Sequence, residues 1–141
     1  MGLDLTCNDL DVKCGSYSRV HEVRYLLLCA LKDYVKHCHS VNDDLINYLQ
    51  SLVKEKYEIE YEKYSEEYQK KLNDLNIGGF TSFIWHSDSD GYLSPYQANK
   101  FMQTWNIIKN FADEELKYGQ EFYLDDIFTE SIESGKDIIF W

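Results

Sequence analysis

The sequence predicts an α+β fold that is mostly helical, with several helices packed against a minimal sheet of short strands. Apolar residues recur every three or four positions over long stretches, and short β-type segments lie near both ends of the chain. One proline and seven glycines leave few breaks in 141 residues. Because no linker or repeat interrupts the chain, we expect residues 1–141 to form a single globular domain.

The first half of the chain predicts a short strand and two long helical stretches. Residues 3–7 are expected to form the strand, and residues 8–15 to be polar and irregular. A helix is expected from Ser16 or Ser18 to Cys38, with Ser18 as a plausible cap. The pattern stays helical from about 44 to 76. A single helix of that length would be roughly 50 Å long at 1.5 Å per residue, so we expect a break near residues 57–60. Its tyrosine stripe predicts a partly buried seam.

The second half predicts two helices and two strands. Gly78 and Gly79 are expected to end the preceding helix, and residues 80–85 to form a buried strand. Residues 86–94 are expected to be a loop. Ser94, Pro95 and Gln97 form a capping box that opens the next helix. A last helix is expected over about 120–134 and a closing strand over 138–141. The sheet would therefore combine the N-terminus, residues 80–85 and the C-terminus.

Composition narrows the classes of function. The net charge of −11 disfavours nucleic acid and anionic lipid as partners, since both need Lys and Arg. No run of apolar residues is long enough to span a membrane, and the acidic start of the chain does not resemble a secretory signal. We therefore expect an intracellular, cytoplasmic protein with reduced cysteines. His37, Cys38 and His39 point in different directions on a helix, which disfavours zinc.

The segment 86–97 carries the main chemical pattern of the chain. It matches the register of a twelve-residue calcium loop, with Gly91 at the sixth position, where a sharp turn is needed. The predicted metal ligands are Asp88, Asp90, the carbonyl of Tyr92 and Ser94. His86 and Gln97 stand where such a loop has carboxylates, and a strand is expected where it has a helix. Calcium is thus the one cofactor suggested, with an affinity on the order of millimolar.

Two other interpretations of this segment stay open. Asp and Ser side chains bind their own main chain in turns, and carboxylates favour helix N-termini, so the segment is equally a turn that precedes a helix. Alternatively, His86 beside Asp88 would act as a general base. No nucleophile or other catalytic motif elsewhere in the chain completes such a site.

The segments 1–5 (MGLDL), 15–18 (GSYS) and 86–91 (HSDSDG), with Arg24, Ser94 and Pro95, resemble a family of small uncharacterised proteins. Its members occur in bacteria, bacteriophages and large DNA viruses, and the resemblance covers both ends of the chain. Ser89 stands where the family often has Cys. The family has no established activity to transfer.

The resemblance implies that these segments converge at one end of the sheet. The candidate binding residues are Asp4, Tyr17, Arg24, His86, Asp88 and Asp90. Arg24 would then pair with Asp88 or Asp90, or would only hold the loop closed.

The leading functional interpretation is a small interaction or regulatory protein of viral or phage type, whose acidic surface meets a basic protein partner. The first alternative is weak calcium binding through the Asp88/Asp90 loop. The second is a hydrolase centred on His86. The sequence predicts neither a substrate nor an oligomeric state.

Overall fold

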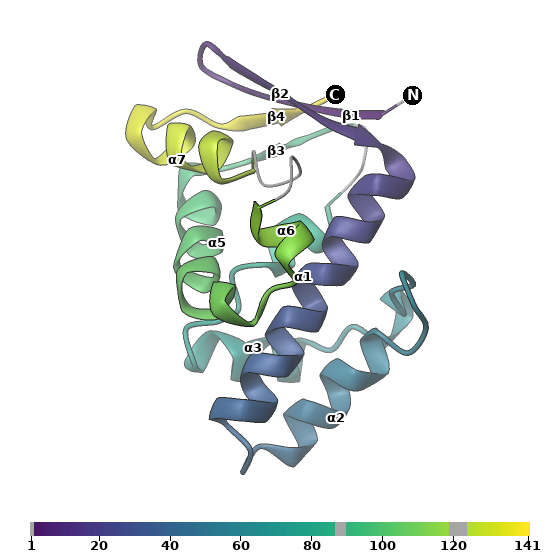
Figure 1. The fold of residues 1–141 in the computed structure, drawn as a ribbon. Helices are drawn as coiled ribbons and strands as arrows, with labels where there is room; N and C mark the ends of the chain where they lie inside the picture. The colour runs from purple at the N-terminus through teal and green to yellow at the C-terminus, as the bar shows by residue number, and fades with distance from the viewer. Residues whose placement is uncertain (1, 87–89, 119–123) are drawn as a thin grey trace.

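Seven α-helices pack against a small four-stranded antiparallel sheet in the computed structural model (Figure 1). It describes residues 2–86, 90–118 and 124–141. The predicted α+β class with predominant helix is therefore confirmed. The sheet lies at one end of the molecule with the helices on one side of it, and both chain termini lie at this sheet (Figure 1).

The sheet has the strand order β2-β1-β4-β3. Its strands are β1 (Gly2–Cys7), β2 (Leu10–Ser16), β3 (Tyr92–Leu93) and β4 (Ile138–Phe140). The predicted strands at both ends of the chain are thus present, and they pair with each other through Leu5 and Phe140. Leu3, Leu5, Leu93, Ile138 and Phe140 are buried against the helices. The alternate residues leave the opposite face of the sheet to solvent.

Three predictions about the strands were wrong. Residues 86–94 were expected to be a loop, yet Tyr92 and Leu93 form the edge strand β3. Residues 8–15 were expected to be irregular, yet residues 10–16 form β2 after a tight turn in which Asn8 has φ of 56°. Residues 80–85 were expected to be a strand, yet Thr81–Ile84 form the short helix α4. Phe83 and Ile84 are buried in either case, and a short apolar run does not distinguish a buried strand from a buried helical turn.

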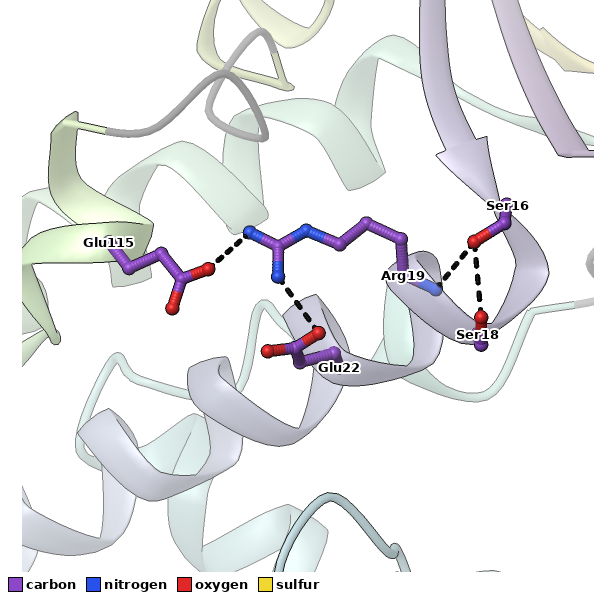
Figure 2. A network of polar contacts seen from close by, with 5 residues as sticks. All are labelled: Ser16, Ser18, Arg19, Glu22 and Glu115. Atoms are coloured by element: carbon purple, nitrogen blue, oxygen red, sulfur yellow. Dashed lines mark hydrogen bonds and ion pairs between the residues drawn. The ribbon is translucent and has the colours of Figure 1, made fainter.

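The first helix, α1 (Tyr17–Cys38), has the predicted extent. Its N-cap is Ser16 instead of Ser18, because the Ser16 hydroxyl accepts the backbone N–H of Arg19 at 3.2 Å. The Arg19 guanidinium lies 2.8 Å from both Glu22 and Glu115, and Figure 2 shows this group between the two carboxylates. Arg19 therefore ties the start of α1 to helix α6 (Glu114–Tyr118).

The predicted break in the middle helical stretch is confirmed and is wider than expected. The stretch divides into α2 (Asp43–Leu52) and α3 (Glu66–Asp74), joined by irregular chain and the short 3-10 helix η1 (Tyr61–Lys63). The tyrosines of this region pack against side chains of other segments: Tyr57 on Tyr25, Tyr61 on His21, and Tyr64 on Trp85. A turn with φ of 62° at Tyr57 reverses the chain where a continuous helix would have projected into solvent.

The capping box is present as predicted at helix α5 (Pro95–Ile108). The Ser94 hydroxyl accepts the Gln97 N–H at 3.2 Å, and the Gln97 side-chain oxygen accepts the Ser94 N–H at 2.9 Å. Helix α5 continues into the 3-10 helix η2 (Lys109–Phe111), and α7 (Leu124–Ser134) packs beside α5. The predicted start of α7, near residue 120, lies outside the described residues. No helix among the described ranges combines the length and apolar character that a bilayer crossing requires.

Candidate functional site

The segment singled out by the sequence lies between α4 and α5, at the edge of the sheet. Its described residues are His86 and 90–97, and the predicted ligand Asp88 lies outside the described residues. Tyr92 and Leu93 form the edge strand β3, which pairs with β4. Gly91 has φ of 95°, a backbone conformation that suits glycine and turns the chain into this strand.

His86 is engaged with the end of its own loop. Its Nε2 atom lies 3.0 Å from the carbonyl oxygen of Tyr92. Because a carbonyl oxygen only accepts, Nε2 is the donor. The imidazole also stacks on the Phe140 ring, with centroids 3.8 Å apart and an interplanar angle of 27°. These contacts give His86 a structural role in closing the loop on β4.

Arg24 lies at the entrance of the same loop. Its side chain is buried, with 3% exposure, and its Nη2 donates to the His86 carbonyl at 3.1 Å. The guanidinium also lies over the Phe83 ring, 5.1 Å from the centroid. Asp90, one of its two predicted partners, is exposed. Arg24 thus contacts the loop through the main chain of His86, whereas Asp88, its other predicted partner, lies outside the described residues.

The N-terminal members of the predicted site lie on β1 and α1. Asp4 is partly exposed and forms an ion pair of 3.8 Å with Lys13. Tyr17 is half-buried and is the first residue of α1. The sequence did not single out Cys14 as part of this site. Cys14 interrupts the pairing of β1 with β2, since Leu3 pairs with Gly15 and Asp4 with Lys13.

Such a bulge re-aims one side chain, and here the Cys14 thiol enters the surroundings of Asp4 and Arg24. Burial first, and then the Asp4 carboxylate, raise the pKa of this thiol from 9.0 to about 12, while Arg24 acts in the opposite direction. A thiol with so high a pKa is a poor nucleophile at neutral pH. The alternation of Leu10, Val12 and Cys14 was the signal that would have predicted β2.

Two of the predicted calcium ligands already accept hydrogen bonds. The Tyr92 carbonyl accepts from His86, and the Ser94 hydroxyl accepts from the Gln97 N–H. Asp90 is exposed. In the part of the chain that the structure describes, no three His, Cys, Asp or Glu side chains form a cluster able to hold a metal ion.

An open groove of about 660 Å³ lies beside this loop. Tyr92, Ser94 and Gln97, which belong to the predicted loop, line one side of it. Residues of α3, α4, α5 and the Gly78-Gly79 turn line the rest. We call it the amide groove, and its lining residues are Gln69, Asn73, Asn76, Gly78, Gly79, Thr81, Ser82, Tyr92, Ser94, Tyr96, Gln97, Lys100, Gln103 and Thr104.

Hydrogen bonds and one close backbone approach fix the floor of the amide groove. The Gln69 amide donates to Asn73 at 3.1 Å and to the Gly78 carbonyl at 2.9 Å, and it accepts from the Thr81 hydroxyl. The Gly79 N–H donates to the Thr104 hydroxyl at 2.8 Å. A Cβ atom on Gly79 would collide with the Lys100 carbonyl, so glycine lets this turn pass directly over α5.

The amide groove differs in charge from the rest of the chain. Asp and Glu supply 25 of the 141 residues, yet none of the fourteen lining residues is acidic and Lys100 is the one charged residue among them. The groove could not be predicted from the sequence, because Asn, Gln and Lys on helices are typical of a solvated face. The Gly-Gly pair was the only local signal of a close approach.

No family model, curated protein or solved structure matches this chain. The site is therefore interpreted from its own residues and their geometry.

Proposed function

We propose that this protein is an interaction module and that the amide groove is its recognition surface for another protein. The observation that carries this proposal is the absence of carboxylates among the fourteen described lining residues of the groove in a strongly acidic chain. The centres of protein interfaces are depleted of Asp, Glu and Lys and enriched in Tyr. Two exposed tyrosines, Tyr92 and Tyr96, have exposures of 59% and 68% in this groove.

The remaining composition of the groove supports the same proposal. Tyr supplies rigid contact area with few rotatable bonds, and Ser, Asn and Gly supply adaptable hydrogen bonding, as in antibody paratopes. Pockets for small molecules are mostly apolar and enclose most of their ligand. An open groove lined by amides and hydroxyls fits a polymer that lies across it better than such a ligand.

The overall charge would act at longer range than the groove. A net charge of −11 steers a basic partner toward this protein during encounter. Tyrosines and amides would then make the close contacts. Calcium binding and hydrolysis are weaker proposals, because His86 and the Tyr92 carbonyl are bonded to each other.

Site-specific photo-crosslinking tests this proposal. A benzoylphenylalanine introduced at Tyr96, in the groove, is compared with one at Tyr64, which is 37% exposed and does not line the groove. In cells that express the full chain, the Tyr96 probe should give a discrete conjugate that the Tyr64 probe does not. Gln103→Ala should weaken that conjugate, whereas Gln50→Ala, at an exposed glutamine on α2, should not. Equal conjugates at both positions, or none at Tyr96, would contradict the proposal.

A further inference from the structure

The amide groove retains hydrogen-bonding groups after its own framework is satisfied. Gln69, Thr81, Ser94, Gln97 and Thr104 are engaged in building its walls. The side chains of Asn76, Ser82 and Gln103 have no hydrogen-bond partner within the described ranges, and the Asn73 amide uses only its oxygen there. Donors and acceptors thus line a groove whose floor is fixed.

Amide side chains match one kind of ligand particularly well. An Asn or Gln side chain offers one acceptor and two donor hydrogens side by side, which is the complement of a peptide unit in extended chain. A row of such groups would bind a peptide main chain without fixing its side chains. The exposed rings of Tyr92 and Tyr96 would cover the side chains that lie between these contacts.

Addition of a strand to the sheet is the less favoured mode at this edge. The adjacent edge strand is β3, but its Tyr92 carbonyl accepts from His86 and the following Ser94 N–H donates to Gln97. An incoming strand needs such main-chain groups to be available. The amide side chains of α3 and α5 are the groups that remain for a bound segment.

Lys100 gives the groove a charge preference. It lies one helical turn after Tyr96, and its ammonium group lies 5.5 Å from the centroid of the Tyr96 ring. No acidic residue is among the described groove residues. Among the described lining residues, a Lys or Arg side chain would therefore meet only the repulsion of Lys100, whereas a carboxylate would pair with it. Screening weakens charges beyond about 8 Å at physiological ionic strength, so Lys100, which lines the groove itself, favours a carboxylate there.

We infer that the amide groove binds an extended peptide segment with uncharged side chains and one carboxylate, which pairs with Lys100. This inference rests on the proposed function and specifies its partner. Basic residues of the partner, which the net negative charge of this protein attracts, would lie outside the segment bound in the groove.

Selection from a phage-displayed library of random peptides tests the inference. The full chain is used as bait, and Tyr96→Ala serves for counter-selection, since Tyr96 is 68% exposed and its loss should not affect folding. The peptides retained should carry Asp or Glu at one position and should lack Lys and Arg beside it. Synthetic versions of one such peptide, with the acid changed to Gln or to Lys, are then compared by fluorescence polarisation.

Exchange of the charges at Lys100 and at the acidic position of the peptide tests whether these two groups pair. The acid-to-Gln peptide should bind wild type about two- to fivefold more weakly, because Lys100 is exposed, and the acid-to-Lys peptide should bind more weakly still. Lys100→Glu should reverse the order of the acidic and the Lys peptides. Lys109→Glu, at an exposed lysine on η2 outside the groove, should leave the order unchanged.

Three results would overturn the inference. They are retained peptides rich in Lys or Arg, no peptide that depends on Tyr96, and binding of maltohexaose or cellohexaose that is lost in Tyr96→Ala. If the crosslink at Tyr96 forms while the peptides show no acidic preference, the interaction function stands and only the ligand class is wrong. If neither is seen, both proposals fail.

Discussion

The Nε2 atom of His86 donates to the carbonyl oxygen of Tyr92 at 3.0 Å, and this bond joins the two ends of the loop between α4 and β3. The same imidazole stacks on Phe140 of β4. One side chain therefore closes the loop and fixes it on the sheet. His86, which the sequence pattern suggested as a general base, thus holds the loop against β4.

Replacement of His86 should destabilise the fold. His86→Ala removes the ring stacking and leaves the Tyr92 carbonyl without its donor, so we expect a loss of about 2 kcal/mol in the free energy of unfolding. His86→Phe keeps an aromatic contact and should lose less. His37→Ala, at an exposed histidine, should change it by no more than about 0.5 kcal/mol. Urea denaturation measures all three. An unfolding midpoint unchanged by His86→Ala would show that the contacts of His86 with Tyr92 and Phe140 do not stabilise the fold.

Arg24 should not tolerate lysine. Its guanidinium is buried, donates to the His86 carbonyl at 3.1 Å and lies over the Phe83 ring. A lysine ammonium lacks the planar fork that makes both contacts, so Arg24→Lys and Arg24→Met should each lower the free energy of unfolding by about 2 kcal/mol.

Arg19 on the same helix provides the matched comparison for Arg24. Its ion pairs with Glu22 and Glu115 are partly exposed, so Arg19→Lys should cost less than about 1 kcal/mol. Thermal unfolding of the four proteins, wild type included, would rank these costs. Equal losses at both positions would contradict a special role for Arg24.

The sequence predicted those elements of the fold that depend on a regular spacing of apolar residues. The extent of α1, the capping box at Ser94 and the strands near the two chain ends follow from periodicity and from local hydrogen-bonding preference. It failed at Phe83 and Ile84, because an apolar run of six residues fits a buried strand and a buried helical turn equally well. It also missed β2, where Leu10, Val12 and Cys14 alternate with polar residues over a short segment that also contains Asp11, Lys13 and Gly15.

Part of the amide groove belongs to a segment that the sequence singled out by its composition and not by its periodicity. The segment 86–97 stood out through its Asp, Gly and Ser residues, and its second half does line the amide groove. Gln69, Asn73 and Gln103 could not be predicted as groove residues, because an amide on the surface of a helix indicates only exposure to solvent. Their common position becomes evident only in the tertiary fold, where α3 and α5 line the same groove. Only Gly79, which α5 approaches closely, marked that contact in the sequence.

The alkaline stability of the protein should depend on Cys14. Its thiol has a pKa of about 12 in the folded protein against 9.0 ordinarily, mainly because of burial. A raised folded pKa means that the unfolded chain loses the proton first. The contribution of this thiol is fully present below pH 9 and is lost as the pH rises toward 12. Near pH 10 the loss should be about 1 kcal/mol.

Comparison of wild type with Cys14→Ala isolates that effect from other groups. Burial likewise raises the pKa of Tyr25 to about 12, so both proteins should lose stability in alkali. Only wild type should show the additional loss from the thiol, measured as the difference in unfolding free energy between about pH 8 and pH 10. Identical slopes in the two proteins would mean that the Cys14 thiol is more accessible than its burial implies.

Calcium should not raise the melting temperature. A metal ion that binds only the folded state must stabilise it, and a millimolar site at about 10 mM Ca²⁺ would add about 1.4 kcal/mol. The Tyr92 carbonyl and the Ser94 hydroxyl are already in hydrogen bonds, so we expect no shift. Mg²⁺ at the same ionic strength is the control. A rise specific to Ca²⁺ and abolished by Asp90→Asn would restore the calcium interpretation.

The two adjacent glycines of the amide groove should respond differently to alanine. A Cβ on Gly79 would overlap the Lys100 carbonyl, which is backbone in the middle of α5 and does not move without shifting the helix. Overpacking of this kind costs about 1–3 kcal/mol. A Cβ on Gly78 would meet the side chains of Asn73 and Gln69 instead, which have other rotamers available. Gly78→Ala should therefore cost less stability than Gly79→Ala.

The same pair of variants also tests the groove as a binding surface. Gly78→Ala displaces the amides of Asn73 and Gln69, which form the floor, so it should weaken peptide binding more than it weakens the fold. Gly79→Ala should impair both together, since it separates α5 from the turn. Urea midpoints and polarisation titrations on the same preparations give the two quantities. If Gly78→Ala binds the selected peptide as well as wild type does, the floor amides take no part in recognition.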